Sequence, residues 1–232
     1  MNFKVFDATP IQLSHFNLET DLLLEAAERA NSKMEYIHKK TPAMKLDVFS
    51  VIDFRVLSGL IGETFITELA SVCPNLKKNP NLDGYPDLVQ VSTNEMMNYF
   101  KTCASSDFIK YKYGGIEVKN TFGTKGGAAT ILQGDSRIGN INKKLDWKAH
   151  HQETNNLIGL FSDYFDGLPK IAGIFFSNSL TRDDWSAVQR PKEGSAMTSF
   201  TSISATGYKK MISGVKACVE QDDYLNFFNL LK

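Results

Sequence analysis

The chain has 232 residues, of which 42% are apolar and 22% are charged, and its formal net charge is zero. These proportions are ordinary for a globular protein and supply enough apolar side chains for a sizeable core. A neutral chain is not expected to bind nucleic acid or anionic membrane through bulk charge, although a basic segment can do so locally. Residues 101–150 form such a segment, with nine lysines and arginines against four acidic residues.

The cysteines and the N-terminal residues indicate the cellular setting. Cys73, Cys103 and Cys218 are odd in number and far apart, unlike the paired cysteines of a secreted disulfide scaffold. The first ten residues lack a basic region followed by an apolar run, and no stretch approaches about 18 uninterrupted apolar residues. We therefore expect a cytoplasmic protein without a signal peptide or a membrane span.

Two long helices are predicted in the first third of the chain. Apolar residues spaced three or four apart predict a helix over residues 17–38. A second helix is predicted to begin at Ser50, because Ser50 and Asp53 have capping-box spacing, and to end near Val72. This second helix is apolar on two opposite faces, so we expect it to be buried on two sides.

Glu63 lies in the stripe of small residues on this second helix, flanked by Gly59 and Gly62. A buried carboxylate is costly unless it is paired or binds a metal. Two interpretations of Glu63 are open: a metal-site residue, or a buried glutamate satisfied by a hydroxyl or backbone donor. Glu68 lies on the other stripe, nearer the helix end, and is expected to reach solvent more easily.

The rest of the chain alternates between predicted strands and helices. Spacing, composition and turn residues predict the following elements in order: a strand at 85–91, a short helix or loop insertion at 94–102, a strand at 108–119, a hairpin and exposed loop at 120–151, a helix at 152–166, a buried strand at 171–176, and an amphipathic helix near 224–231. Together these elements predict a single α/β domain over residues 1–232, with a central mixed β-sheet flanked by helices.

Three charged residues on the two central predicted strands suggest chemistry. Asp87 lies on the first strand, and Glu117 and Lys119 share one face of the second because alternate strand residues point the same way. Mg²⁺ typically takes one or two carboxylates and binds substrate phosphate in its remaining positions. Two carboxylates beside an ammonium therefore predict a Mg²⁺ site suited to phosphodiester hydrolysis, in which Lys119 orients or helps to deprotonate the attacking water.

The spacing of Glu117 and Lys119 is not specific by itself. A Glu-x-Lys sequence is expected roughly once per chain of this size by chance, and Asp146-Trp147-Lys148 has the same form. The context favours Glu117, since a Pro-Asp strand and a buried helix with Glu63 precede it. The alternatives are that Asp87 solvates its own backbone at a strand edge and that Glu117 and Lys119 form a solvated pair.

The arrangement of Pro86-Asp87, then Glu117-Val118-Lys119, after a helix with a glutamate resembles the PD…(D/E)xK nuclease superfamily, and most closely its type II restriction endonucleases. The resemblance covers a catalytic core of about residues 50–177 and implies a restriction-endonuclease-like fold. It implies these roles: Mg²⁺ binding by Asp87, Glu117 and the backbone carbonyl of Val118, catalysis by Lys119, and completion of the site by Glu63.

The resemblance also implies a function. It implies a Mg²⁺-dependent, site-specific deoxyribonuclease that cuts double-stranded DNA to leave 5′-phosphate and 3′-hydroxyl ends. It further implies a homodimer on a palindromic site and a cognate DNA methyltransferase in the same host. Three alternatives are open: a repair, nicking or junction-resolving nuclease of the same fold, a non-catalytic DNA-binding protein, and a metal-dependent enzyme acting on small phosphates.

DNA contacts are expected in two polar segments, residues 120–150 and 181–210. The side chains there that suit phosphates and base edges are Lys125, Arg137, Asn142, Lys143, Lys144, Arg190 and Lys192. Each of them is also compatible with a solvated charged loop. His150 and His151 have no Cys or His partner at metal-ligand spacing, so a phosphate or base contact is expected before a catalytic role.

Overall fold

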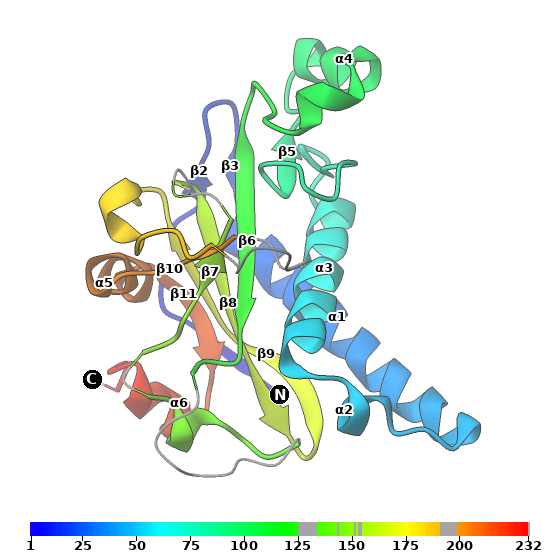
Figure 1. The fold of residues 1–232 in the computed structure, drawn as a ribbon, viewed down its shortest axis with the longest axis vertical. Helices are drawn as coiled ribbons and strands as arrows, with labels where there is room; N and C mark the ends of the chain where they lie inside the picture. The colour runs from blue at the N-terminus through cyan, green and yellow to red at the C-terminus, as the bar shows by residue number, and fades with distance from the viewer. Residues whose placement is uncertain (125–133, 143, 151, 153–154, 191–198, 232) are drawn as a thin grey trace.

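The computed structural model describes residues 1–124, 134–142, 144–150, 152, 155–190 and 199–231. The chain forms an α/β structure around a seven-stranded mixed sheet (Figure 1). Across this sheet the strands lie in the order β1 (Phe3–Val5), β11 (Val215–Val219), β9 (Leu168–Ser177), β8 (Leu157–Phe165), β6 (Gly115–Thr121), β5 (Leu88–Gln90) and β4 (Leu76–Lys78). Strands β6 and β8 are parallel, and every other neighbouring pair is antiparallel.

Helices cover both faces of the sheet. One face carries α1 (Thr20–Lys40) and α3 (Phe54–Val72), and the other carries α5 (Ala205–Ser213) and α6 (Asp222–Phe227) (Figure 1). The smaller elements are α2 (Val48–Val51), α4 (Asn94–Thr102), the strand pair β2 (Ile11–Gln12) and β3 (Asn17–Leu18), and the strand pair β7 (Lys148–Ala149) and β10 (Thr201–Ser202). None of the helices in the described ranges has the length and apolar character of a membrane span.

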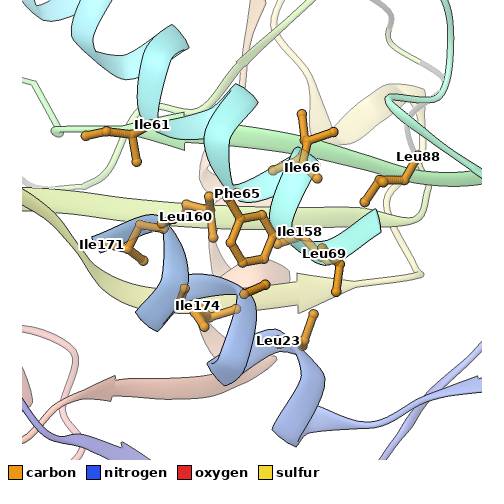
Figure 2. Packing of buried hydrophobic residues seen from close by; sticks show 14 of the residues in the cluster. Leu23, Ile61, Phe65, Ile66, Leu69, Leu88, Ile158, Leu160, Ile171 and Ile174 are labelled. Carbon is orange, nitrogen blue, oxygen red and sulfur yellow. The ribbon is translucent and has the colours of Figure 1, made fainter. Parts of the chain in front are cut away.

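The core on the α1 and α3 side is centred on Phe65. Figure 2 shows Phe65 of α3 beside the sheet residues Ile158 and Leu160, with Leu23 of α1 in the same cluster, and Phe65 is fully buried. Burying one such side chain contributes about 1.5–3 kcal/mol. This packing fixes α3 against the sheet beside β6, which brings one side of the helix to the candidate site described below.

Several predicted elements are confirmed. The predicted helix at 17–38 corresponds to α1, the short helix at 94–102 is α4, and the buried strand at 171–176 lies within β9. The start of the second long helix is corrected. Asp53 is itself the N-cap of α3, where its carboxylate accepts hydrogen bonds from the N–H groups of Arg55 and Val56, and Ser50 lies in the separate short helix α2.

The helix predicted at 152–166 is wrong, because residues 157–165 form strand β8. The apolar run fits helical spacing, but β8 lies in the middle of the sheet and is buried on both faces, so it lacks the polar alternation of a half-buried strand. Asp166 (φ 51°) and Gly167 (φ 79°) form the turn into β9. Asp-Gly is a strong two-residue hairpin signal, and it marks this turn in the sequence.

The exposed loop predicted at 120–151 is also wrong for its described part. Leu145 and Trp147 are fully buried in the core on the α5 and α6 side, and β7 pairs with the distant β10. The strands predicted at 85–91 and 108–119 are found as the shorter β5 and the shifted β6. Strand β11 was not predicted, and it joins the C-terminal part of the chain to β1.

Candidate active site

Asp87 and Glu117 are brought together by the pairing of β5 with β6. Leu88 lies opposite Ile116 and Val89 lies opposite Gly115, so the residue that precedes β5 comes level with Glu117. Glycine is required at position 115, since a Cβ there would lie 1.9 Å from the carbonyl oxygen of Leu88. The close approach of the two strands therefore places Asp87 beside Glu117.

Asp87, Glu117 and Lys119 form one connected cluster. The Nζ atom of Lys119 lies 2.6 Å from Oε1 of Glu117 and 3.2 Å from Oδ2 of Asp87. The backbone N–H of Asp87 donates to Oε2 of Glu117 at 3.1 Å, and the N–H of Val118 donates to Oδ2 of Asp87 at 2.8 Å. The three side chains therefore converge as predicted. Glu117 and Lys119 do not form the solvated pair that was the alternative, because both are largely buried.

Burial shapes the electrostatics of this cluster. The Glu117 side chain is 5% exposed and Lys119 is 18% exposed. Burial raises the pKa of the Glu117 carboxyl to about 7, although Lys119 acts to lower it. Burial acts to lower the pKa of the Lys119 ammonium, but the charges of Asp87 and Glu117 outweigh it and raise that pKa above its ordinary value. Lys119 is therefore a cation at neutral pH.

The donor set of the cluster suits a hard cation. Asp87 and Glu117 offer carboxylate oxygens, and the carbonyl of Val118 points to the same strand edge as its N–H, which donates to Asp87. The described residues contain no group of three or more His, Cys, Asp or Glu side chains placed to hold a metal. Two carboxylates and a carbonyl match Mg²⁺, which keeps several water ligands, better than a metal that needs a closed protein cage.

The cluster opens into a cleft of about 830 Å³ along one edge of β6. Strand β8 covers the other edge from Glu117 to Thr121, whereas β5 pairs only with Gly115 and Ile116. The N-terminal half of α3 lies along the uncovered edge, where Ser58 Oγ donates to the backbone carbonyl of Asn120 at 2.8 Å. Because β5 begins only at Leu88, opposite Ile116, the edge of β6 beside Asp87 is open to a ligand.

The expectations for Glu63 and Glu68 are reversed by the structure. The Glu63 side chain is 53% exposed and pairs with Lys78 at 2.5 Å, although it does line the cleft. Glu68 is the buried glutamate, and it forms ion pairs with Lys33 and Arg29 of α1. Glu63 faces the open cleft, so its charge is solvated, while packing of α1 against α3 encloses Glu68.

The residues predicted to contact DNA have different surroundings. Lys125, Lys143 and Lys192 lie outside the described residues. Lys144 makes a contact within the fold, because its Nζ donates a hydrogen bond to the carbonyl oxygen of Ile203 at 2.6 Å.

The other three residues predicted to contact DNA, Asn142, Arg190 and Arg137, lie within the described ranges. Asn142 and Arg190 are exposed, as a solvated loop or a DNA contact would require. Arg137 is only 6% exposed and lines the cleft that holds Asp87 and Lys119. Of the predicted contacts, Arg137 is therefore the one that the described structure places in the candidate site.

Residues on and beside β7 also line the cleft, although the sequence favours Glu117 over Asp146 and gives His150 no metal-ligand spacing. Asp146 and Lys148 imitate the Glu-x-Lys spacing and also line the cleft, where they pair at 3.6 Å. His150 lines the cleft as well, with Nδ1 3.0 Å from the carbonyl oxygen of Ser199, and His151 lies outside the described residues. The pairing of β7 with β10 brings them there, and no local pattern reveals that pairing.

Comparisons with protein-family models, with curated proteins and with solved structures found no match to this chain.

Proposed function

We propose that the protein is a Mg²⁺-dependent endonuclease that hydrolyses double-stranded DNA at a short specific site, in the manner of type II restriction endonucleases. In this proposal the products carry 5′-phosphate ends, the protein acts as a homodimer with a restriction-endonuclease-like core, and a cognate DNA methyltransferase protects the host. The resemblance of the Pro-Asp and Glu-x-Lys motifs to that superfamily supports the proposal.

One observation carries the proposal: Asp87 and Lys119 line a cleft and lie 3.2 Å apart, and Glu117 lies behind them, 2.6 Å from Lys119. Chance supplies a Glu-x-Lys sequence but not an aspartate from a neighbouring strand within reach of both residues. A structural ion pair needs no cleft beside it, whereas phosphodiester hydrolysis needs room for a phosphate next to the carboxylates.

The roles of the residues follow from their chemistry. Bound Mg²⁺ would supply charge neutralisation at the phosphate and a water of lowered pKa. Asp87, Glu117 and the Val118 carbonyl would hold the ion. Lys119 is kept cationic by its two carboxylate neighbours, so it would donate hydrogen bonds to the attacking water or to a phosphate oxygen, stabilising negative charge as it develops.

The test is incubation of unmethylated phage DNA with the protein and Mg²⁺, followed by sequencing of the ends. Discrete fragments are expected with Mg²⁺ and none with EDTA. Asp87→Asn and Lys119→Met should abolish cleavage, while Glu25→Gln, a carboxylate change on the exposed surface of α1, should retain it. Full activity of Asp87→Asn or Lys119→Met would refute the assignment of the site.

The same assay separates the competing functions. Cleavage of mismatched or branched DNA with intact linear duplex would indicate a repair or junction-resolving nuclease instead. Metal-independent DNA binding without cleavage of any substrate would indicate a non-catalytic DNA-binding protein. Hydrolysis of small phosphate esters, without cleavage of any DNA, would indicate an enzyme that acts on small phosphates.

A further inference from the structure

Arg137 is a buried cation in the cleft, and no described carboxylate forms an ion pair with it. The other cations that line the cleft have carboxylate partners: Lys119 pairs with Asp87 and Glu117, Arg55 with Asp53, and Lys148 with Asp146. Arg137 forms no such ion pair with a described residue, although it is only 6% exposed. A buried guanidinium normally has a carboxylate or phosphate partner, because removing its charge from water is costly.

The guanidinium of Arg137 still has hydrogen-bond donors to offer. Its Cζ atom lies over the ring of Phe54, 4.2 Å from the centroid. A contact with an aromatic face uses none of the hydrogen-bond donors of the guanidinium, so its N–H groups remain available. The Nε atom is buried and has no hydrogen-bond partner within the described structure. These donors have no hydrogen-bond partner among the described residues, so a ligand in the cleft can supply one.

The backbone that carries Arg137 is fixed by Asp163 of β8. This fully buried carboxylate accepts hydrogen bonds from the N–H groups of Arg137 at 2.7 Å and of Ile138 at 3.0 Å. It also accepts from the hydroxyls of Ser136 at 3.1 Å and Tyr224 at 3.0 Å. Both oxygens of Asp163 are thus used in holding the segment in place, and no ion pair with the guanidinium forms.

The protonation state is consistent with this geometry. Burial lowers the pKa of Arg137, and the charge of Asp163 only partly offsets it. An arginine nevertheless stays charged at neutral pH. The cleft therefore holds a positive charge that has no ion-pair partner among the described residues. The same cleft is lined by Asp87 and Lys119.

We infer that Arg137 binds a phosphate group of the nucleic acid strand in the cleft and that Asp163 positions Arg137 for this contact, an inference that rests on the proposed function. A phosphate fits because it accepts two parallel N–H bonds from a guanidinium, as a carboxylate does, and because every nucleotide of the strand supplies one. Arg137 is thereby a binding residue for the DNA backbone and does not read bases.

The test measures binding of a fluorescently labelled duplex that contains the cleaved site to the full-length protein, with Ca²⁺ in place of Mg²⁺. Arg137→Met should weaken binding roughly 10- to 100-fold, the factor expected for loss of a charged hydrogen bond. The dependence of log Kd on log salt concentration should become shallower by about one. Arg137→Lys should fall between wild type and Arg137→Met.

Two controls separate the contact from general effects. Arg29→Met makes the same chemical change on the surface of α1, where Arg29 pairs with Glu25 at 2.6 Å, and it should leave both affinity and salt dependence unchanged. Asp163→Asn should weaken binding, and adding it to Arg137→Met should weaken binding no further, because both act through one contact. Thermal unfolding of each variant confirms that it is folded at the assay temperature.

The outcomes distinguish this inference from the proposed function. If wild type cuts DNA and Arg137→Met binds with unchanged affinity and salt dependence, the phosphate contact is refuted and the nuclease stands. If wild type neither binds nor cuts DNA, both are refuted. If Asp163→Asn weakens binding equally in the presence and absence of Arg137, Asp163 does not act through Arg137, and its positioning role is refuted.

Discussion

Replacement of Lys119 by methionine should destabilise the protein in a way that depends on pH. The change keeps much of the side-chain volume but removes the ammonium that lies 2.6 Å from Glu117 and 3.2 Å from Asp87. Removing one partner of a buried ion pair costs about 3–5 kcal/mol. Because Lys119 is 18% exposed, we expect the lower end, about 3 kcal/mol. For a chain of this size that is a fall in Tm of roughly 6–12 °C.

The pH dependence follows from Glu117, whose folded pKa is raised from 4.5 to about 7. A carboxyl with a raised folded pKa loses folding stability as pH rises from its unfolded pKa through its folded one. Without Lys119 the ionised form of Glu117 is less favourable still. The loss caused by Lys119→Met should therefore be larger at pH 8 than at pH 5, where Glu117 is protonated in the folded protein and only the ion pair with Asp87 is lost.

The measurement is thermal unfolding in EDTA at both pH values, with Lys170→Met as the matched control. Lys170 is also mostly buried and pairs with Glu35 at 2.6 Å. The hydrogen bond from Lys170 lowers the pKa of Glu35, so Glu35 is ionised at pH 5 and at pH 8, and the control should lose the same stability at both. An equal loss for Lys119→Met at both pH values would refute the reasoning.

Three further changes test the core, the strand pairing and the buried carboxylate. Phe65→Ala should lower the free energy of unfolding by about 3–5 kcal/mol, measured by urea denaturation, because it opens a cavity between α3 and the sheet. Gly115→Ala should lower Tm and remove the proposed DNA cleavage, since its Cβ would lie 1.9 Å from the carbonyl oxygen of Leu88; an equally stable variant would contradict this packing. In EDTA the wild type should lose folding stability as pH rises from about 4.5 to 7, and Glu117→Gln should not show this loss. A variant with the same pH profile as wild type would exclude Glu117 as the source of the loss.

The sequence predicted well those elements whose local pattern agrees with their final environment. The helix at 17–38 is found as α1 and the helix at 94–102 as α4, because each has one apolar face and one solvated face. The prediction failed for β8, where burial on both faces removed the alternation that identifies a strand. The Asp166-Gly167 turn is the local signal that separates the two possibilities.

The interpretation of Glu63 failed because burial of a helix face depends on what covers it. Glu63 and Glu68 are on the same helix, and the sequence places both among apolar residues. Strand β5 begins only opposite Ile116 and leaves Glu63 beside an open cleft, whereas α1 covers Glu68 and supplies Lys33 and Arg29 as partners. Both facts come from segments distant in the chain.

The sequence by itself determined the chemical groups of the candidate site and one piece of its geometry. Strand periodicity places Glu117 and Lys119 on one face because alternate strand residues point the same way. Only the tertiary structure decided that Asp87 joins them, through the register of β5 against β6, and that Arg137 enters the same cleft, through Asp163 of β8. These contacts join segments tens of residues apart, and local pattern contains no information on their pairing.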